Sequence, residues 1–382
     1  MSAIGVGLVG SRFMGRTRSK AYRQVARFID LDLSSRMRAI CGRDEAGVKD
    51  AAALGWESSE TDYERMLERY DVDLVDVATP GDTHHQMAIA ALEAGKHVLC
   101  EKPLANNLRE AKEMLEASRR AGTVSMVCFN YRRAPAVQLA KQLIDEGRLG
   151  EIRHWRAMYL QDWLVDPGFP MTWRLQKETA GSGSLDDIGS HLVDLAQFLV
   201  GNITEVVGAT ETFIKERPLG EEGAGAEMGR VTVDDDAAFL ARLENGAMRT
   251  FEVTRLAPGR KARESFEING SRGSVFFDLE RMNELDVYLK DDSPDVKGFR
   301  TVLVTEPDHP YMQAWWPPGH IIGYEHTFVH TTKDLLEGIS AGKSPQPSFE
   351  DRYRCQAVLE AVERSFENRE WMRPETFEPK ED

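Results

Sequence analysis

Short apolar segments alternate with amphipathic helical patterns through the first 130 residues, and this alternation constrains the fold more than any other feature. The apolar segments are rich in β-branched residues and are bounded by Gly, Asp or Pro, which is typical of buried strands. The predicted strands are Ile4–Val9, Met37–Cys41, Val72–Thr79, His97–Cys100 and Val124–Phe129. Because strands that alternate with helices form parallel βαβ units, the sequence predicts a doubly wound parallel α/β sheet over residues 1–130.

Two of the helical segments carry boundary signals. One begins after Asn107, an N-cap residue with Glu110 three positions on, and ends before Gly122, a typical C-terminal cap. The other runs from about His85 to Ala94 and is also followed by a glycine. These signals predict two helices between strands of the sheet.

After about residue 150 the pattern changes to longer strands, some of them separated by hairpin signals such as Asn269-Gly270. The predicted strands are Ile152–Gln161, Glu205–Ile214, Ala237–Leu243, Ala247–Arg255, Arg263–Ile268, Gly273–Asp278, Glu284–Leu289 and Arg300–Val304. Helical patterns interrupt them at Asp187–Val200, Tyr324–Ile339 and Asp351–Asn368. Residues 131–382 are therefore predicted to form an α+β domain with a large, mostly antiparallel open sheet, which binds substrate and forms oligomer contacts.

A glycine-rich turn after the first strand indicates where a dinucleotide would bind. The motif Gly5-x-Gly7-x-x-Gly10 has the right spacing, but its first two glycines lie inside the predicted strand. The register Gly10–Gly15 follows the strand and opens a helix, so its backbone N–H groups would face a pyrophosphate. Arg12 replaces the usual middle glycine and could place its charge near the phosphates. The candidate cofactor contacts of this turn are Gly10, Arg12, Phe13 and Met14, and a turn without a ligand is the alternative.

The end of the second predicted strand bears on the choice between NAD and NADP. A carboxylate there binds the adenosine ribose of NAD, whereas a basic residue accommodates the 2′-phosphate of NADP. The sequence has Cys41-Gly42-Arg43-Asp44, in which Arg43 could stack on adenine or meet a 2′-phosphate. Asp44 could instead be the N-cap of the next helix. These residues leave the choice of cofactor open.

Two polar motifs follow buried strands and so lie at the carboxyl edge of the sheet, where ligands of open α/β sheets bind. One is the turn Thr79–His84, and the other is Glu101-Lys102-Pro103. An ammonium group at Lys102 could lower the pKa of a substrate hydroxyl or polarise a carbonyl. A surface lysine before a turn is the alternative. The candidate cofactor contacts of these motifs are Thr79, Pro80, His84, Glu101 and Lys102.

A glycine loop at Gly181–Ser184 leads into a helix that is predicted to place Asp187 and His191 on one face. A carboxylate beside an imidazole holds the imidazole's tautomer and raises its basicity, as a general base requires. A capping Asp and a hydrogen-bonded core His are the alternative from spacing alone. No other His or Cys spacing supplies partners for a metal ion, so no metal site is predicted.

Three motifs in this order resemble the Gfo/Idh/MocA oxidoreductases, which include glucose–fructose oxidoreductase and the inositol dehydrogenases. They are Glu101–Ala105, the Thr79–His84 turn and the Asp187-x-x-x-His191 helix, and the resemblance spans nearly the whole chain. It implies a Rossmann domain followed by a sheet domain, and it implies that Lys102, Asp187 and His191 are catalytic. It favours NAD without excluding NADP. Three residues depart from the family pattern: Arg12, Arg18 where a His is frequent, and Gly81 where an Asn is usual.

A narrower resemblance, to the levoglucosan dehydrogenases and related sugar 3-dehydrogenases, rests on the segments Phe129–Ala136, Tyr159–Trp163 and Trp173–Lys177. Their aromatic and amide groups suit a polyhydroxylated ring, although the tryptophans could instead belong to the core or to an oligomer interface. The run from His309 to His320 also suggests a rigid loop that lines the substrate site or reaches a neighbouring subunit. The candidate substrate contacts are Asn130, Tyr131, Arg132, Tyr159, Gln161, Trp163, Trp173, Arg174 and His320.

These features predict an NAD(P)-dependent dehydrogenase that oxidises a secondary hydroxyl of a neutral sugar, anhydrosugar, glycoside or inositol. The alternatives are a glycoside-cleaving enzyme that oxidises C3 transiently with retained NAD, and a non-catalytic cofactor-binding sensor. A net charge of −15, from 63 acidic and 48 basic residues, argues against nucleic acid as a partner. With no long apolar segment and only scattered cysteines, we expect a cytoplasmic protein without a membrane partner. The family resemblance and the open sheet predict a homodimer or homotetramer.

Overall fold

The computed structural model describes residues 2–220, 227–244 and 246–377, and its contacts group the chain into two compact units. The first unit comprises the residues up to Arg133 together with Ile322–Tyr353. The second comprises Ala134–Ile321 and Arg354–Thr376. The predicted second domain comprised residues 131–382, whereas Ile322–Tyr353 belong by their contacts to the first unit.

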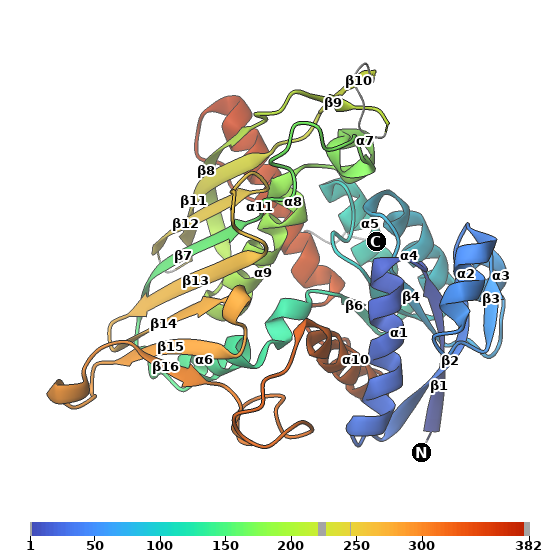
Figure 1. The fold of residues 1–382 in the computed structure, drawn as a ribbon, viewed down its shortest axis with the longest axis horizontal. Helices are drawn as coiled ribbons and strands as arrows, with labels where there is room; N and C mark the ends of the chain where they lie inside the picture. The colour runs from blue at the N-terminus through green and yellow to red at the C-terminus, as the bar shows by residue number, and fades with distance from the viewer. Residues whose placement is uncertain (1, 221–226, 245, 378–382) are drawn as a thin grey trace. The chain divides into compact units, whose positions relative to one another are not determined.

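The strands of the first unit form a six-stranded parallel sheet in the order β3-β2-β1-β4-β5-β6 (Figure 1). They are β1 (Ser2–Val9), β2 (Leu33–Cys41), β3 (Ser58–Glu60), β4 (Leu74–Val77), β5 (His97–Cys100) and β6 (Ser125–Val127). The order reverses between β1 and β4, as in a Rossmann dinucleotide-binding fold, and ligands of such sheets bind at that switch point. The predicted doubly wound sheet is confirmed. The additional strand, β3, is too short to produce a pattern in the sequence.

The helices of the first unit connect these strands and cover the sheet. They are α1 (Phe13–Phe28), α2 (Glu45–Ala52), α3 (Tyr63–Leu67), α4 (His84–Glu93), α5 (Leu108–Ala121) and α10 (Tyr324–Ser340), with the 3-10 turns η1 (Gly81–Thr83) and η2 (Asn130–Arg133). The predicted caps of α5 are confirmed, since Asn107 Oδ1 accepts a hydrogen bond from the Glu110 N–H at 3.0 Å and Gly122 has a left-handed φ of 64°. α10 packs against α1 and η2 although it begins some 190 residues after the end of η2.

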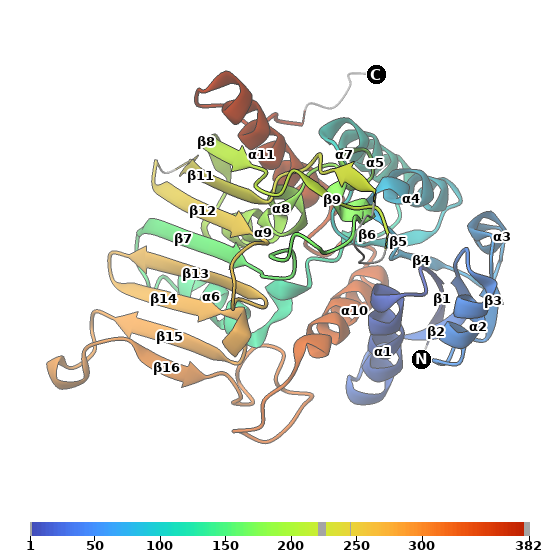
Figure 2. The same cartoon turned by 45° about the horizontal axis from the view of Figure 1, so that its top comes forward.

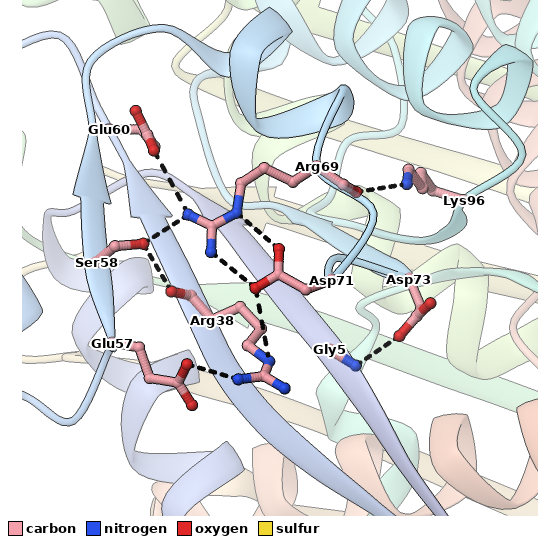
Figure 3. A network of polar contacts seen from close by, with 9 residues as sticks. All are labelled: Gly5, Arg38, Glu57, Ser58, Glu60, Arg69, Asp71, Asp73 and Lys96. Atoms are coloured by element: carbon pink, nitrogen blue, oxygen red, sulfur yellow. Dashed lines mark hydrogen bonds and ion pairs between the residues drawn. The ribbon is translucent and has the colours of Figure 1, made fainter.

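A polar network surrounds Gly5 and explains the glycine spacing inside the first strand (Figure 3). The Gly5 N–H donates to Asp73 Oδ2 at 2.8 Å, and a Cβ at Gly5 would lie 1.8 Å from the Asp71 carbonyl oxygen. Asp71 is held in turn by Arg69, with Nε–Oδ1 at 2.9 Å, and lies 3.9 Å from Arg38 Nε. Gly5 therefore permits close packing of β1 against the turn before β4, and it takes no part in a dinucleotide turn.

The main sheet of the second unit has eight strands in the order β16-β15-β14-β13-β7-β12-β11-β8 (Figure 2). They are β7 (Ile152–Leu160), β8 (Ile203–Glu211), β11 (Asp236–Leu243), β12 (Met248–Thr254), β13 (Arg263–Gly270), β14 (Gly273–Asp278), β15 (Glu284–Leu289) and β16 (Arg300–Leu303); β9 (Glu216–Pro218) and β10 (Met228–Arg230) form a separate ribbon. All neighbouring pairs are antiparallel except β7 with β12. Because β12 and β13 run in opposite directions, a strand inserted between them is parallel to one of the two. The mostly antiparallel sheet is thus confirmed.

One face of this sheet is buried and the other is exposed within the chain. In β12, Arg249, Phe251 and Val253 are buried, whereas alternate residues are exposed. α6, α8 and α9 pack against the buried face (Figures 1 and 2). The remaining helices and 3-10 turns are α6 (Pro135–Asp145), α7 (Lys177–Ala180), α8 (Ser184–Asp187), α9 (Gly189–Val200), α11 (Phe349–Asn368), η3 (Trp173–Leu175), η4 (Leu279–Arg281) and η5 (Pro294–Val296). Among the helices described, none combines the length and apolar character needed to cross a bilayer.

Candidate active site

The glycine turn joins β1 to α1 at the switch point of the parallel sheet. Gly10 has a φ of 120°, and a Cβ at this position would lie 2.4 Å from the Ala78 carbonyl oxygen. A Cβ at Gly15 would lie 2.1 Å from the Gly10 carbonyl oxygen. Both glycines are therefore required by the tight turn and by the close packing of the helix on the strand. The register that begins at Gly10 is the one that the fold uses.

The N-terminus of α1 is open and positively charged. Arg12 occupies the N-cap position without a side-chain cap hydrogen bond, and the helix begins at Phe13, which is 65% exposed. The first N–H groups of a helix have no partner within the helix and carry a partial positive charge, which suits an anion. An exposed guanidinium beside these groups fits a pyrophosphate, so the predicted contacts Gly10, Arg12, Phe13 and Met14 share one turn.

The end of β2 adjoins this turn. The Gly10 N–H donates to the Cys41 carbonyl at 2.8 Å, which fixes the turn against the strand. A Cβ at Gly42 would lie 2.8 Å from a methyl group of Val48, so a larger residue there would press on α2. Arg43 is exposed, and the exposed Asp44 occupies the N-cap position of α2 without a side-chain cap hydrogen bond.

His84 connects the two predicted polar motifs and is fully buried. Its Nδ1 lies 2.6 Å from the Pro103 carbonyl oxygen and its Nε2 lies 2.8 Å from the Thr79 carbonyl oxygen. Burial lowers the pKa of His84, while the two carbonyls favour the protonated ring. The geometry gives His84 a structural contact with both turns. Thr79 and Pro80, in contrast, are partly exposed at the strand end.

Glu101 is anchored by a buried arginine that the sequence analysis noted only as a departure from the family pattern. Arg18 Nη2 donates to Glu101 Oε2 at 2.7 Å, and Arg18 Nε lies 3.9 Å from Asp76 Oδ2. Burial raises the pKa of Asp76 to about 6, and the Tyr22 hydroxyl donates to it at 3.0 Å. This network fixes the backbone that presents Lys102, whose side chain is partly exposed.

In the second unit, the continuous helix predicted to carry Asp187 and His191 is wrong, because the structure divides it into two helices. α8 ends at Asp187 and α9 begins at Gly189, while the His191 N–H donates to the Ile188 carbonyl at 3.2 Å, three residues back. The break lies at Ile188, whose φ is −115°, and Gly189 follows it as the first residue of α9. His191 is 5% exposed and its ring lies edge-on to Tyr159, with centroids 6.0 Å apart.

The carboxylate of Asp234 holds the loop that leads to Asp187. It accepts four hydrogen bonds, from the hydroxyls of Ser182 and Ser184 at 2.8 and 2.6 Å and from the N–H groups of Gly183 and Leu185 at 2.7 and 2.8 Å. A Cβ at Gly183 would lie 1.8 Å from the Asp234 carbonyl oxygen. The glycine of this loop therefore serves close packing against Asp234, and Asp234 is a site residue that the sequence analysis missed.

The candidate substrate contacts divide between the two units. In the first unit, Asn130 Nδ2 donates to Thr327 Oγ1 at 2.8 Å, and Tyr131 lies against Tyr324 with ring centroids 6.2 Å apart. Asn130, Tyr131 and Arg132 are all buried. Their side chains therefore pack with η2 and α10.

In the second unit, the loop after β7 forms its own small apolar cluster. Trp163 donates to Gln161 Oε1 at 2.9 Å and packs against a core of Leu164, Leu175, Val231 and Val233. The Arg174 guanidinium lies 4.2 Å from the centroid of the Trp173 ring. His320 is exposed and contacts the Pro317 carbonyl in its own loop, at 2.9 Å. The structure thus groups Gln161 with Trp163, Trp173 with Arg174, and Tyr159 with His191.

The chain matches two family models in the order that the architecture predicts. Residues 4–129 match the "Oxidoreductase family, NAD-binding Rossmann fold", and residues 137–276 match the "GFO/IDH/MocA C-terminal domain". The chain belongs to the GFO/IDH/MocA oxidoreductase family.

Relatives and solved structures agree with this assignment. The chain is 41% identical to the levoglucosan dehydrogenase of Pseudarthrobacter phenanthrenivorans, over 97% of this chain and 98% of that protein. A solved structure of levoglucosan dehydrogenase in complex with NADH is similar with a TM-score of 0.95, covering 98% of this chain and 100% of that chain. An oxidoreductase domain protein from Kribbella flavida is 53% identical with a TM-score of 0.96, with coverage of 98% and 100%.

Across the part of the chain that the structure describes, no three His, Cys, Asp or Glu side chains are grouped to hold a metal ion. In the first unit the candidate residues are positioned by the glycine turn and by the buried Arg18–Glu101 pair, and in the second unit they are positioned by the loop that Asp234 holds. Two residues beside the loop that ends at Asp187 were not predicted: Asp234, described above, and the buried Arg255, whose Nη1 lies 3.6 Å from Asp187 Oδ2. The sequence signals for them are an acidic run, Asp234-Asp235-Asp236, and an arginine at the end of an apolar strand.

Proposed function

We propose that this GFO/IDH/MocA oxidoreductase is an NAD-dependent dehydrogenase that oxidises a secondary hydroxyl of a neutral sugar, anhydrosugar, glycoside or inositol. The observation that carries this proposal is the 41% identity to levoglucosan dehydrogenase over nearly the full length of both chains. Solved structures of that relative include a complex with NADH and levoglucosan. A neutral substrate also agrees with the net charge of −15, which would repel an anionic one.

The glycine turn supports NAD as the cofactor. Gly10 and Gly15 leave no space for side chains, and Arg12 offers a charge beside the open end of α1. Backbone N–H groups of this turn would hold the pyrophosphate, and Arg43 or Asp44 would lie near the adenosine. When bound, NAD supplies the hydride acceptor for the reaction.

The chemical roles proposed for the chain's own residues follow from their charge and hydrogen-bonding capacity. His191 takes the proton of the substrate hydroxyl, and Asp187 orients the His191 ring and favours its protonation. The ammonium group of Lys102 stabilises the negative charge that develops on the substrate oxygen. Effects of this kind are each worth about 10²–10⁴-fold in rate. His84 and Arg18 hold the two turns around Lys102 through the contacts described above.

A substrate screen tests the proposal. Sugars, anhydrosugars, glycosides and inositols are each incubated with NAD and with NADP, and reduction is followed by nicotinamide absorbance. We expect reduction of NAD by at least one neutral polyol. Release of an aglycone without net NADH would indicate transient oxidation instead, and binding of NADH without any turnover would indicate a sensor. Preference for NADP would assign Arg43 to the 2′-phosphate.

Variants then test the assigned residues. Lys102→Ala and His191→Asn are expected to lower turnover by at least about 10²-fold while leaving the circular dichroism spectrum unchanged. Matched controls are Lys96→Ala, a residue directly before β5 that contacts the Arg69 carbonyl (Figure 3), and His154→Asn, an exposed position on β7. Near-normal rates for both Lys102→Ala and His191→Asn would show that the catalytic assignment is wrong.

A further inference from the structure

Arg255 follows β12 directly and links three segments of the candidate site in the second unit. Its guanidinium is fully buried, with Nη1 3.6 Å from Asp187 Oδ2 and Nη2 donating to the Asp234 carbonyl at 3.2 Å. The guanidinium carbon lies 5.7 Å from the centroid of the Trp163 ring. The Arg255 carbonyl accepts from the Leu164 N–H at 3.3 Å. One residue therefore contacts the end of α8, the Asp234 segment and the loop that carries Trp163.

The hydrogen bonding of Arg255 is incomplete, as it is for several other buried arginines of the described chain. Its Nε and Nη1 make no hydrogen bond within the described residues. Arg217, a second buried arginine, also has an Nε without a hydrogen bond, but it donates to the carbonyls of Leu164 at 2.6 Å and Asp166 at 2.7 Å, as expected for a residue that secures a loop. Burying a guanidinium is costly unless its donors are satisfied. Among the described residues, Arg255 differs from Arg217 in having a carboxylate within ion-pair distance, that of Asp187 at 3.6 Å.

The carboxylate side chain within ion-pair distance of Arg255 is that of Asp187, the residue proposed to orient the base. A cation this close favours the ionised form of a carboxylate. We propose that Arg255 is a positioning residue for Asp187 and His191, whose charge keeps Asp187 ionised and whose contact with Trp163 ties this pair to the candidate substrate loop. This inference rests on the proposed dehydrogenase function.

Carboxyl groups outnumber cations around the pair. The titratable and charged groups on the elements packed around it are Asp186, Asp194, Asp234, Asp235, Glu264, Glu363, Tyr159, Lys177, Arg217 and Arg352. Lys177 is paired with Glu363 at 3.6 Å, and Arg217 donates to backbone carbonyls. Loss of the Arg255 charge would therefore leave an excess of carboxylates around Asp187 and His191.

The direction of the resulting pH effect follows from these charges. Without the cation, both the neutral carboxyl of Asp187 and the cationic ring of His191 become more favourable, so the pKa of each group rises. Oxidation of an alcohol requires Asp187 ionised and His191 neutral. Both changes therefore move the acidic limb of kcat/KM toward higher pH. A nearby cation of this kind shifts a carboxyl pKa by about 1–3 units, so a displacement of about one unit or more is expected.

The experiment compares Arg255→Met and Arg255→Lys with the wild-type chain, using the best substrate from the screen with NAD. kcat and KM are measured from pH 5 to pH 10. Arg255→Met is expected to lower kcat by about 10²-fold and to move the acidic limb upward by about one unit. Arg255→Lys retains the charge, so its limb should stay near the wild-type position even though its turnover falls.

Arg217→Met is the matched control, because it removes a buried arginine of the same region that holds backbone carbonyls. It should reduce thermal stability without moving the limb. The inference is overturned if Arg255→Met lowers kcat/KM at every pH without moving the acidic limb. If Arg255→Met does not fold, Arg255→Lys decides. That variant keeps the charge, so an acidic limb displaced by about one pH unit in Arg255→Lys overturns the inference. If the wild-type chain oxidises no alcohol with either cofactor, the proposed function fails and the inference fails with it.

Discussion

Removal of the Asp234 carboxylate is the most informative test of how the loop before Asp187 is held. Each of its oxygens accepts from one hydroxyl and one backbone N–H: Oδ1 from Ser182 and Gly183, and Oδ2 from Ser184 and Leu185. In Asp234→Ala the hydroxyls can turn to water, whereas the two N–H groups lose a charged acceptor. At about 1.5–3 kcal/mol for each such bond the upper limit is about 6 kcal/mol, and because Asp234 is half-buried we expect about 3 kcal/mol.

Hydrogen exchange of the loop measures this loss directly. A reduction of about 3 kcal/mol in the free energy of local opening accelerates exchange of the Gly183 and Leu185 amides by about 10²-fold. Asp234→Asn keeps one acceptor oxygen, so its effect should be intermediate. Turnover should fall by about 10²-fold in Asp234→Ala, because the loop ends at a residue that must be placed accurately.

The neighbouring Asp235 provides the control. Its Oδ2 accepts from the N–H groups of Phe213 and Ile214, at 2.9 and 3.0 Å, and so it holds a different turn. In Asp235→Ala the amides of that turn should exchange faster, while those of Gly183 and Leu185 should keep their protection. The reasoning is refuted if Asp234→Ala leaves the exchange of its own loop unchanged, or if both variants affect both loops equally.

Three further changes test separate parts of the structure. Burial raises the pKa of Glu363 to about 7, so ionisation of this carboxyl destabilises the fold as pH rises from about 4.5 to 7. The melting temperature of Glu363→Gln relative to that of wild type should therefore be higher at pH 8 than at pH 5. The same difference in melting temperature at both pH values would contradict this. Gly15→Ala places a methyl group 2.1 Å from the Gly10 carbonyl oxygen, so fluorescence titration should show weaker NADH binding and melting should occur earlier. Asn107→Ala loses the cap bond to the Glu110 N–H and should cost about 1 kcal/mol of stability, seen as a lower melting temperature with unchanged turnover.

The fold of the first unit could be predicted because its signals are local. Buried parallel strands produce continuous apolar runs, and the caps of α5 lie within three residues of the helix they bound. The place of α10 could not be predicted, since only its contacts with α1 and η2 assign it to this unit. The break at Ile188 was not predicted either, because the loop before it is held by Asp234, some 50 residues further along the chain.

The same distinction applies to the candidate site. Lys102 and His84 follow strands, and the carboxyl ends of parallel strands share one edge, so sequence position alone indicated where they lie. Asp234 and Arg255 adjoin strands encoded roughly 50–70 residues after Asp187, and their importance arises from pairing across the sheet and from burial. Such long-range contacts leave only weak signals, such as a charged residue at the end of an apolar strand.

The return of α10 to the first unit has a consequence for the order in which the protein is made. Asn130 and Arg133 find their partners Thr327 and Asp334 on α10, and the buried Arg18 lies 5.4 Å from the ring of Phe328. At about 5–20 residues per second, the ribosome takes roughly 10–40 s to reach α10 after it has passed Arg133. During that interval the dinucleotide-binding unit lacks one of its packing partners. The part of the protein that is synthesised first is therefore completed only near the end of synthesis.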